Sequence, residues 1–147
     1  MKKAIIVFMA LFLVTSLVFA QNNADIEKEK AAINKVIEKS YVQGVFIKKD
    51  TEAMAKGFHA EFNMLTFHDG HLHKYPIAKW IESVKKNPKP PKEKFTHKVP
   101  LIDVTGIAAI AKVEIYRDSK HIYTDYLTFY NFGDNWQIVS KIFQEHK

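Results

Sequence analysis

The 147-residue sequence contains no cysteine. The chain can therefore form no disulfide, and no cysteine is present to carry a lipid anchor. The sequence also shows no internal repeat and no low-complexity tract. A hydrophobic core must hold the fold together without covalent cross-links.

An excess of acidic residues is also absent, because 22 Lys and Arg stand against 16 Asp and Glu. The densest basic run, residues 85–94, includes three prolines and no aromatic side chain. Single-stranded nucleic acid is usually held on aromatic platforms beside the charge. The run therefore indicates a solvated loop, and we expect no nucleic-acid partner.

No apolar run is long enough to be a clear membrane span. Residues 4–13 are apolar after two lysines, but Thr15 and Ser16 interrupt the run, and about twenty apolar residues are expected of a spanning helix. A basic start, an apolar stretch and a final Val-Phe-Ala are typical of a cleaved secretory signal. We expect residues 1–20 to be removed after Ala20. Residues 21–147 then form one periplasmic or secreted domain, with no membrane segment after cleavage.

The spacing of apolar residues predicts three helices followed by a long antiparallel meander. Asp25 is expected to cap a first helix whose buried face includes Ile33, Ile37, Tyr41 and Val45. The two further helices are expected over residues 51–57 and from Pro76 to residue 84. The predicted strands cover residues 61–68, 72–74, 95–103, 107–117, 121–132 and 136–143. Helices followed by a meander indicate an α+β fold.

Several segments in this order resemble the putative lumazine-binding group of the nuclear transport factor 2-like superfamily. They are I-x-K-V-I-E-K-S-Y-V-x-G from Ile33, then G-F-H, D-G-x-L, I-D-V-T-G-x-A-A-x-A-K-V-E-I, T-D-Y-L and N-W-x-I-V-x-K-x-F. The resemblance implies a cone-shaped fold, in which a curved antiparallel sheet wraps around three helices and encloses a cavity. It also implies a dimer through the outer face of the sheet in many members. The superfamily includes isomerases, dehydratases and cyclases as well as binding modules, so the fold does not fix the function.

The alternation of apolar residues predicts which side chains face the cavity. A loop of residues 118–120 would pair Val113 with Asp125 and Ala111 with Leu127, which keeps charged side chains outside. A Gly133-Asp134 turn would pair Phe129 with Ile138 and Leu127 with Ser140. A loop of residues 104–106 would pair His97 with Val113. The predicted inner face comprises Phe95, His97, Val99, Leu101, Val113, Tyr123, Asp125, Leu127, Phe129, Trp136, Ile138 and Ile142.

Two ionisable residues, His97 and Asp125, fall in one row of this inner face. Two strand spacings put them about 10 Å apart, close enough to contact one small ligand. A carboxylate in an apolar cavity with no Lys or Arg on its face is a candidate general base. The alternative is structural, with Asp125 bound by Tyr41 or by backbone amides. We therefore name Asp125 and His97 as catalytic candidates. The predicted ligand-binding residues are Tyr41, His59, Trp80, His97, Tyr123, Asp125 and Trp136.

The segment F-H-D-G-H-L-H places three histidines around an Asp69-Gly70 turn, a strong hairpin signal. The turn would set His68 opposite His71, and His73 opposite Thr66. Phe67 and Leu72 would then point to the other face and pack inward. Three imidazoles could bind zinc or copper. However, apart from Asp69 no second residue is present to orient them, so we predict no dedicated metal site.

Three functions remain open from the sequence. The first is an exported, non-catalytic domain that binds a small molecule in the cavity. The second is an isomerase-, dehydratase- or cyclase-type enzyme in which Asp125 transfers a proton and Tyr41, Tyr123 or His97 stabilises an oxyanion. The third is an interaction module that dimerises through Tyr126 and Tyr130 beside Val139 and Lys141. No cofactor is expected in any of the three.

Overall fold

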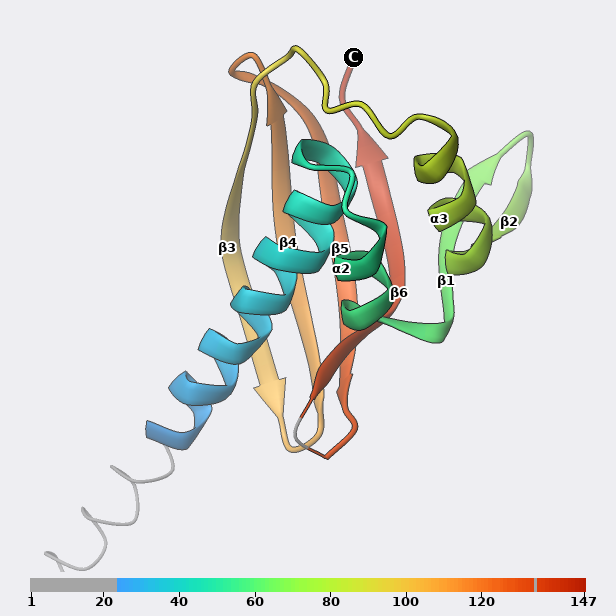
Figure 1. The fold of residues 1–147 in the computed structure, drawn as a ribbon. Helices are drawn as coiled ribbons and strands as arrows, with labels where there is room; N and C mark the ends of the chain where they lie inside the picture. Colours follow the sequence, from blue (N-terminus) through green and yellow to red (C-terminus); the bar gives the residue numbers. More distant parts are fainter. Residues whose placement is uncertain (1–23, 134) are drawn as a thin grey trace, which may run out of the picture.

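The computed structural model describes residues 24–133 and 135–147. The predicted signal segment and its cleavage position lie outside these residues, as does Asp134 of the predicted Gly133-Asp134 turn. Six strands form one curved sheet in the order β2-β1-β6-β5-β4-β3. The helices cover its concave face, and the sheet stays open at both edges (Figure 1). The predicted α+β cone is therefore confirmed, with one parallel pair, β1 with β6, in an otherwise antiparallel sheet.

The first helix changes its winding halfway along. Residues 24–36 are α-helical, and the helix continues as the π-helix η1 (Ile37–Ile47). The amide of Lys48 donates to the carbonyl of Gln43, five residues earlier, as π-helical winding requires. The predicted face is buried, including Ile33, Ile37 and Tyr41. Asp25 does not cap the helix, because residue 24 is already helical.

Helix α2 (Thr51–Gly57) packs closely against the first helix. Asp50 caps α2, its side chain accepting hydrogen bonds from the amides of Glu52 and Ala53. At the other end, a Cβ on Gly57 would lie 2.1 Å from the hydroxyl oxygen of Ser40. Only glycine allows the two helices to approach this closely.

Strands β1 (Phe58–His68) and β2 (His71–Pro76) form the predicted hairpin. Asp69 and Gly70 both have positive φ, and the expected pairs of His68 with His71 and Thr66 with His73 are confirmed. The predicted inward packing of Phe67 and Leu72 is wrong, because their residues are 75% and 61% exposed. Only the tip of the hairpin lies beyond the core, because Phe58 and Phe62 at the start of β1 are buried in it.

Helix α3 (Ile77–Lys86) leads through a loop to β3 (Phe95–Thr105), whose pairing with β4 (Ala108–Arg117) differs from the prediction. The turn sets Thr105 opposite Ala108, and a β-bulge follows between Lys98 and Leu101. His97 consequently lies opposite Ile115 rather than Val113. Leu101, predicted to face inward, lies outside and is 46% exposed.

The pairing of β4 with β5 (Lys120–Asn131) is as predicted, with Val113 opposite Asp125 and Ala111 opposite Leu127. The turn that connects the two strands, however, is shorter than predicted. The turn has two residues, Asp118 and Ser119, both with positive φ. A bulge between Ile115 and Tyr116 then restores the expected register.

The pairing of β5 with β6 (Trp136–Glu145) starts as predicted, with Phe129 opposite Ile138. A bulge next to Phe129 then shifts the register by one residue. Leu127 lies opposite Lys141 instead of Ser140. A shift of one residue exchanges the two faces of a strand. Lys141 therefore points into the core, whereas Ile142 lies on the outer face and is 52% exposed.

Candidate functional site

Three polar side chains meet in the interior of the cone. Asp125 comes from β5, Lys141 from β6 and Tyr41 from the π-helical part of the first helix. Asp125 and Tyr41 have no solvent exposure, and Lys141 is 3% exposed. We call these three residues the buried polar cluster.

The members of this cluster contact one another in a closed triangle. The Lys141 ammonium lies 2.6 Å from Oδ1 of Asp125. It also donates a hydrogen bond of 2.6 Å to the Tyr41 hydroxyl, which in turn donates one of 2.5 Å to Oδ2 of Asp125. Oδ1 is held by the Lys141 ammonium, and no other donor among residues 24–133 and 135–147 reaches this buried oxygen. A carboxylate oxygen can accept two hydrogen bonds, so Oδ1 keeps one unused acceptor position beside Lys141.

Aromatic rings surround the Lys141 ammonium. Its nitrogen lies 4.6 Å from the centroid of Phe143, 5.0 Å from that of Tyr41, 5.5 Å from that of Trp80 and 5.8 Å from that of Tyr123. A cation within about 6 Å of a ring centroid is attracted by the ring quadrupole, most strongly away from water. These rings stabilise the charge where solvent cannot.

Burial changes the acidity of two cluster members. Desolvation lowers the pKa of Lys141, against the pull of the neighbouring Asp125 charge. Desolvation also raises the pKa of Tyr41 well above its ordinary value, and the charge and hydrogen bond of Asp125 raise it further. Tyr41 is thus kept as a proton donor, and Lys141 holds its proton less firmly than an exposed lysine does.

A groove that shares Phe143 with the surroundings of the cluster lies between the ends of β1 and β6. It encloses about 360 Å³ and is lined by Thr66, Phe67, His68, Phe143, Gln144 and Glu145. Phe143 belongs both to this groove and to the rings around Lys141. Its side chain therefore stands between the groove and the buried polar cluster.

A family model described as "Putative lumazine-binding" matches residues 28–144 of the chain. The chain belongs to this family. No curated protein matches the sequence. Among solved structures, a nuclear transport factor 2-like protein of unknown function from Shewanella baltica is 26% identical, with a TM-score of 0.68 over 82% of this chain and 95% of that one.

Two other solved structures share the fold of this putative lumazine-binding domain. A nuclear transport factor 2-like protein of unknown function from Silicibacter pomeroyi is 20% identical, with a TM-score of 0.69 over 82% of this chain and 98% of that one. A protein from Shewanella frigidimarina, named a putative ketosteroid isomerase, is 15% identical, with a TM-score of 0.55 over 77% and 94%. At this identity, both matches show the fold alone.

The putative lumazine-binding domain brings four of the predicted site residues together: Asp125, Tyr41, Trp80 and Tyr123. The expectation that no Lys or Arg shares the face of Asp125 is wrong, because the bulge in β6 turns Lys141 inward. The sequence signal for Lys141 was weak. Ser140 and Lys141 are neighbours, and only the bulge decides which of them is buried.

The other three predicted site residues lie elsewhere. His97 is not in the row of Asp125, and its Nε2 lies 3.1 Å from a carboxylate oxygen of Glu38 on the first helix. His59 stacks on Phe132, with ring centroids 4.6 Å apart. The indole of Trp136 donates a 2.5 Å hydrogen bond to Glu29. None of the three contacts the buried polar cluster.

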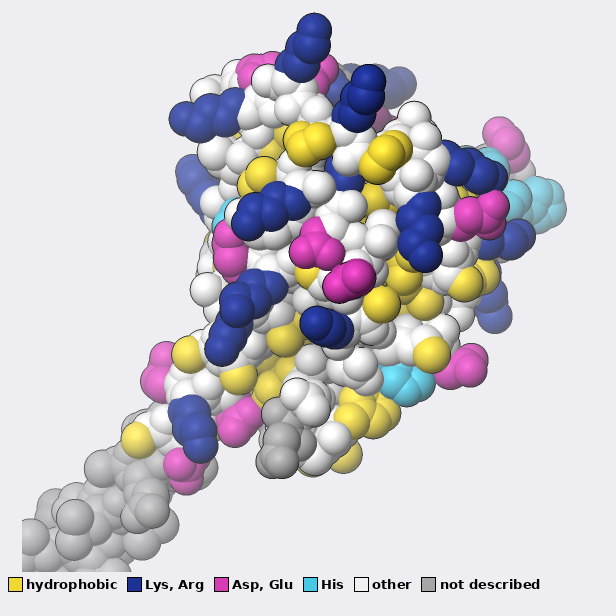
Figure 2. All heavy atoms as spheres, in the orientation of Figure 1, with side chains coloured by type: hydrophobic (Ala, Val, Ile, Leu, Met, Phe, Trp, Pro, Cys, Tyr) yellow, Lys and Arg dark blue, Asp and Glu magenta, His cyan; other side chains and the backbone are white. Residues whose placement is uncertain are grey.

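The three hairpin histidines lie at the tip of the β1–β2 hairpin, at the far edge of the molecule (Figure 2). The rings of His68 and His73 stack with centroids 3.8 Å apart, and His68 also contacts the carboxylate of Asp69 at 3.1 Å. In the described part of the chain, no three His, Cys, Asp or Glu residues are arranged to hold a metal ion. Likewise, no helix in that part is both long and apolar enough to cross a membrane.

Proposed function

We propose that this domain binds a small molecule in the interior of the cone, against the buried polar cluster. The observation that carries the proposal is the burial of a complete ion pair with a tyrosine. Removing charged groups from water costs several kcal/mol per ion, and apolar residues of similar size commonly stabilise a core as well or better. The retained charges, together with the unused acceptor on Asp125, are suited to a ligand.

The chemistry of the cluster selects a flat, polar ligand. Oδ1 of Asp125 can accept a hydrogen bond from a ring N–H, and the Lys141 ammonium, which carries three protons, can donate to a carbonyl or ring nitrogen. The rings of Trp80, Tyr123 and Phe143 offer stacking surfaces. Lumazine, which the family description names, is a flat heterocycle that carries both kinds of group. We propose entry from the groove between β1 and β6 by rotation of Phe143.

Titration with lumazine, followed through the ligand's own fluorescence, tests this proposal. We expect Asp125→Asn combined with Lys141→Met to weaken binding at least tenfold, since the double variant loses the charges without leaving one unpaired. Lys112→Met is the matched control, because Lys112 lies on the outer face and pairs with Glu114. Equal affinity in the double variant and the control would place the ligand elsewhere.

A test of the entry route uses Phe143→Ala. The smaller side chain should speed association in stopped-flow measurements. Ile142→Ala, one residue away on the outer face, should leave the rate unchanged. An unchanged rate in Phe143→Ala would exclude this route while leaving the site itself open.

The second candidate is an enzyme that uses the same cluster for proton transfer. It is favoured by the lowered pKa of Lys141 and by the Tyr41 hydroxyl, which contacts both ions. Lys141 would first release its own proton to solvent and then, as the neutral amine, take a proton from the substrate. Tyr41 would turn its O–H from Asp125 to the developing oxyanion and donate a hydrogen bond to it. Asp125, held by Lys141, would orient both groups.

Isomerisation of a β,γ-unsaturated ketone, followed by absorbance of the conjugated product, tests this candidate. Activity that survives Lys141→Met would contradict it.

We also propose that two copies associate through the outer sheet face. One row across this face joins Leu101, Lys112, Tyr126 and Ile142 on four adjacent strands. Three of these are apolar or aromatic and 46–52% exposed. Monomers rarely leave such a patch open. Lys141, which the sequence placed in this patch, is not part of it.

We propose export as well, on the pattern of the first twenty residues. The basic start, apolar run and Val-Phe-Ala ending support cleavage after Ala20 and a periplasmic or secreted location. Mass spectrometry of protein from its own cells should find a chain that starts at Gln21. An intact Met1 would contradict the proposal.

A further inference from the structure

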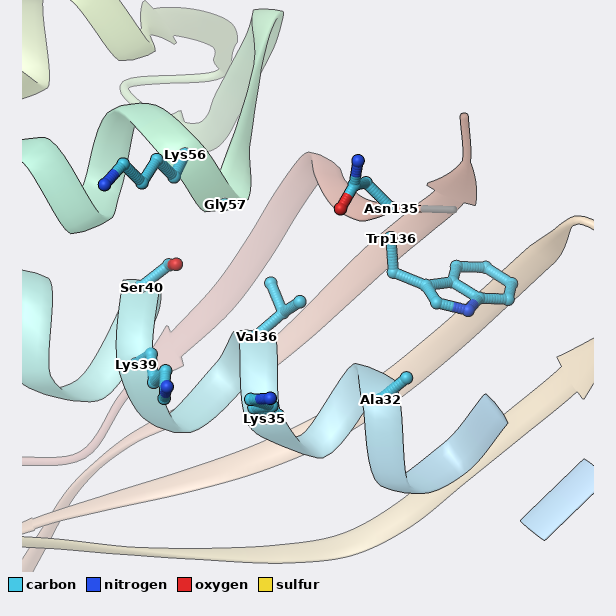
Figure 3. Close-up of a pocket in the computed structure, with 9 residues that line it drawn as sticks. All are labelled: Ala32, Lys35, Val36, Lys39, Ser40, Lys56, Gly57, Asn135 and Trp136. Carbon is cyan, nitrogen blue, oxygen red and sulfur yellow. The ribbon is translucent and has the colours of Figure 1, made fainter. Parts of the chain in front are cut away.

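A second hollow, of about 320 Å³, lies away from the buried polar cluster. It is formed between the first helix, the end of α2 and the start of β6, and Figure 3 shows the side chains around it. The residues that line it are Ala32, Lys35, Val36, Lys39, Ser40, Lys56, Gly57, Asn135 and Trp136. It shares no residue with the cluster, so its ligand need not be the ligand of the cone.

Three lysines from two helices surround this hollow. Lys35 and Lys39 are one turn apart on the first helix, and Lys56 lies in the last turn of α2. None of them forms an ion pair with a carboxylate among residues 24–133 and 135–147, whereas Lys30, Lys86, Lys112 and Lys141 each do. Like charges around one concavity raise the local concentration of anions.

Two carboxylates of the first helix are already engaged elsewhere. Glu29 accepts the indole hydrogen bond of Trp136, whose ring forms part of the wall. Glu38, one residue before Lys39, contacts His97 on the sheet side of the helix. Neither acid therefore serves as a partner for the three lysines.

The remaining lining groups complete a site for an anion with an apolar part. Ser40 and Val36 rise from the first helix toward α2, and Asn135 approaches from the loop before β6 (Figure 3). The hydroxyl and the amide can donate hydrogen bonds, whereas Ala32 and Val36 offer apolar surface. On the same face, basic side chains stand beside exposed hydrophobic surface along the first helix (Figure 2).

We propose that this lysine-lined hollow binds a small organic anion, a carboxylate or phosphate ester with a short apolar body. The ammonium groups hold the anionic end through charge-assisted hydrogen bonds, and Ala32 and Val36 contact the body. The volume is at the lower end of the range for small-molecule pockets, which limits the ligand to about one ring.

Phenyl phosphate is a suitable probe, followed by two-dimensional NMR of the side-chain N–H signals of Trp136 and Asn135. We expect saturable shifts of these signals and weaker binding at high salt, because partly exposed charges are screened. Inorganic phosphate and benzyl alcohol, which carry only one half of the probe each, should bind more weakly. Equal binding of either one would overturn the proposal.

Variants test the role of the lysines. Lys35→Gln, Lys39→Gln and Lys56→Gln should each weaken phenyl phosphate binding about two- to fivefold, as expected for partly exposed ion pairs. Lys85→Gln is the matched control, because Lys85 is an exposed lysine on α3 outside the hollow. The same loss in Lys85→Gln, or no loss in the three variants, would show an ordinary solvated helix face and overturn the proposal.

Discussion

The Lys141 ammonium lies 2.6 Å from Oδ1 of Asp125, at a place where Asp125 has no contact with solvent and Lys141 almost none. Each ion is the main compensation for the other's lost hydration, and Tyr41 bonds to both. The two strands supply one ion each, so the pair depends on the register between β5 and β6. Loss of either charge must therefore affect stability as well as any ligand.

Replacing Lys141 by Met should strongly destabilise the fold. The change leaves the Asp125 carboxylate buried without a cation, and breaking a buried pair in this way costs about 3–5 kcal/mol. Adding Asp125→Asn should restore most of the loss, because the second charge is then also gone. Urea unfolding of both single variants and the double variant gives the coupling energy. Additive losses in the double variant would mean that the two ions do not depend on each other.

Replacing Tyr41 by Phe should cost about 1–3 kcal/mol, since it removes a buried hydroxyl that bonds to both ions. The ring itself remains in place against Phe46 and Phe58. Tyr126→Phe removes the same atom from an exposed ring and serves as the control. Similar stabilities for the two variants would show that the Tyr41 hydroxyl contributes little to the cluster.

Much of the fold could be predicted from apolar spacing. The helix face with Tyr41 and the pairing of Val113 with Asp125 follow from periods of 3.6 and 2. Asp125 was correctly placed inside for this reason. The hairpin turn follows from Asp69-Gly70, which suits the positive φ of both turn positions. The register argument assumed unbroken strands, and the structure breaks them at three bulges.

A bulge and a turn explain which site residues were misplaced. The bulge in β6 turns Lys141 inward. His97 leaves the row of Asp125 because the turn between β3 and β4 pairs Thr105 with Ala108, and the bulge in β3 reverses only one residue of that shift. A bulge adds one residue without changing the alternation on either side, so apolar spacing alone does not locate it. The charge offered a hint, because a buried Asp125 needs a partner and Lys141 is the lysine of the following strand.

Replacing Gly57 by Ala should destabilise the packing of α2 on the first helix. The new Cβ would lie 2.1 Å from Oγ and 2.2 Å from Cβ of Ser40, and Cβ cannot move without the backbone. At Gly44, by contrast, a Cβ would come within 2.9 Å of Met54 Cγ, which a flexible side chain can relieve, and 3.3 Å of the Asp50 carbonyl. Thermal unfolding should show a larger loss for Gly57→Ala than for Gly44→Ala. Adding Ser40→Gly should recover part of it.

Replacing Tyr126 by Glu should convert the proposed dimer into a folded monomer. Tyr126 is 46% exposed in the middle of the outer row, so a charge there would be buried in the interface. Sedimentation velocity measures the mass, and circular dichroism confirms the fold. Ser83→Glu, on an exposed position of α3, should leave the dimer intact. A monomeric natural protein at micromolar concentration would refute the association itself.

The stability of the fold should respond to alkaline pH through Lys141. Burial lowers the pKa of Lys141 in the folded protein, whereas the unfolded chain keeps this proton up to about pH 10.4. Between these two values the unfolded state binds more protons, so this group makes the unfolding free energy rise with pH. Tyr41 acts in the opposite direction. Its raised pKa makes stability fall above about pH 10, where the unfolded tyrosine ionises.

Comparison with the double variant Lys141→Met, Asp125→Asn below about pH 10 separates the two effects, because Tyr41 affects the stability only where the unfolded tyrosine ionises. The unfolding free energy of the natural protein minus that of the double variant should increase as the pH rises toward about pH 10, the ordinary range of a lysine. Urea unfolding at several pH values in this range measures the difference, and all other lysines cancel. A difference that stays constant or decreases would mean that burial does not lower the pKa of Lys141, and the amine would then remain a permanent cation that serves only to balance Asp125.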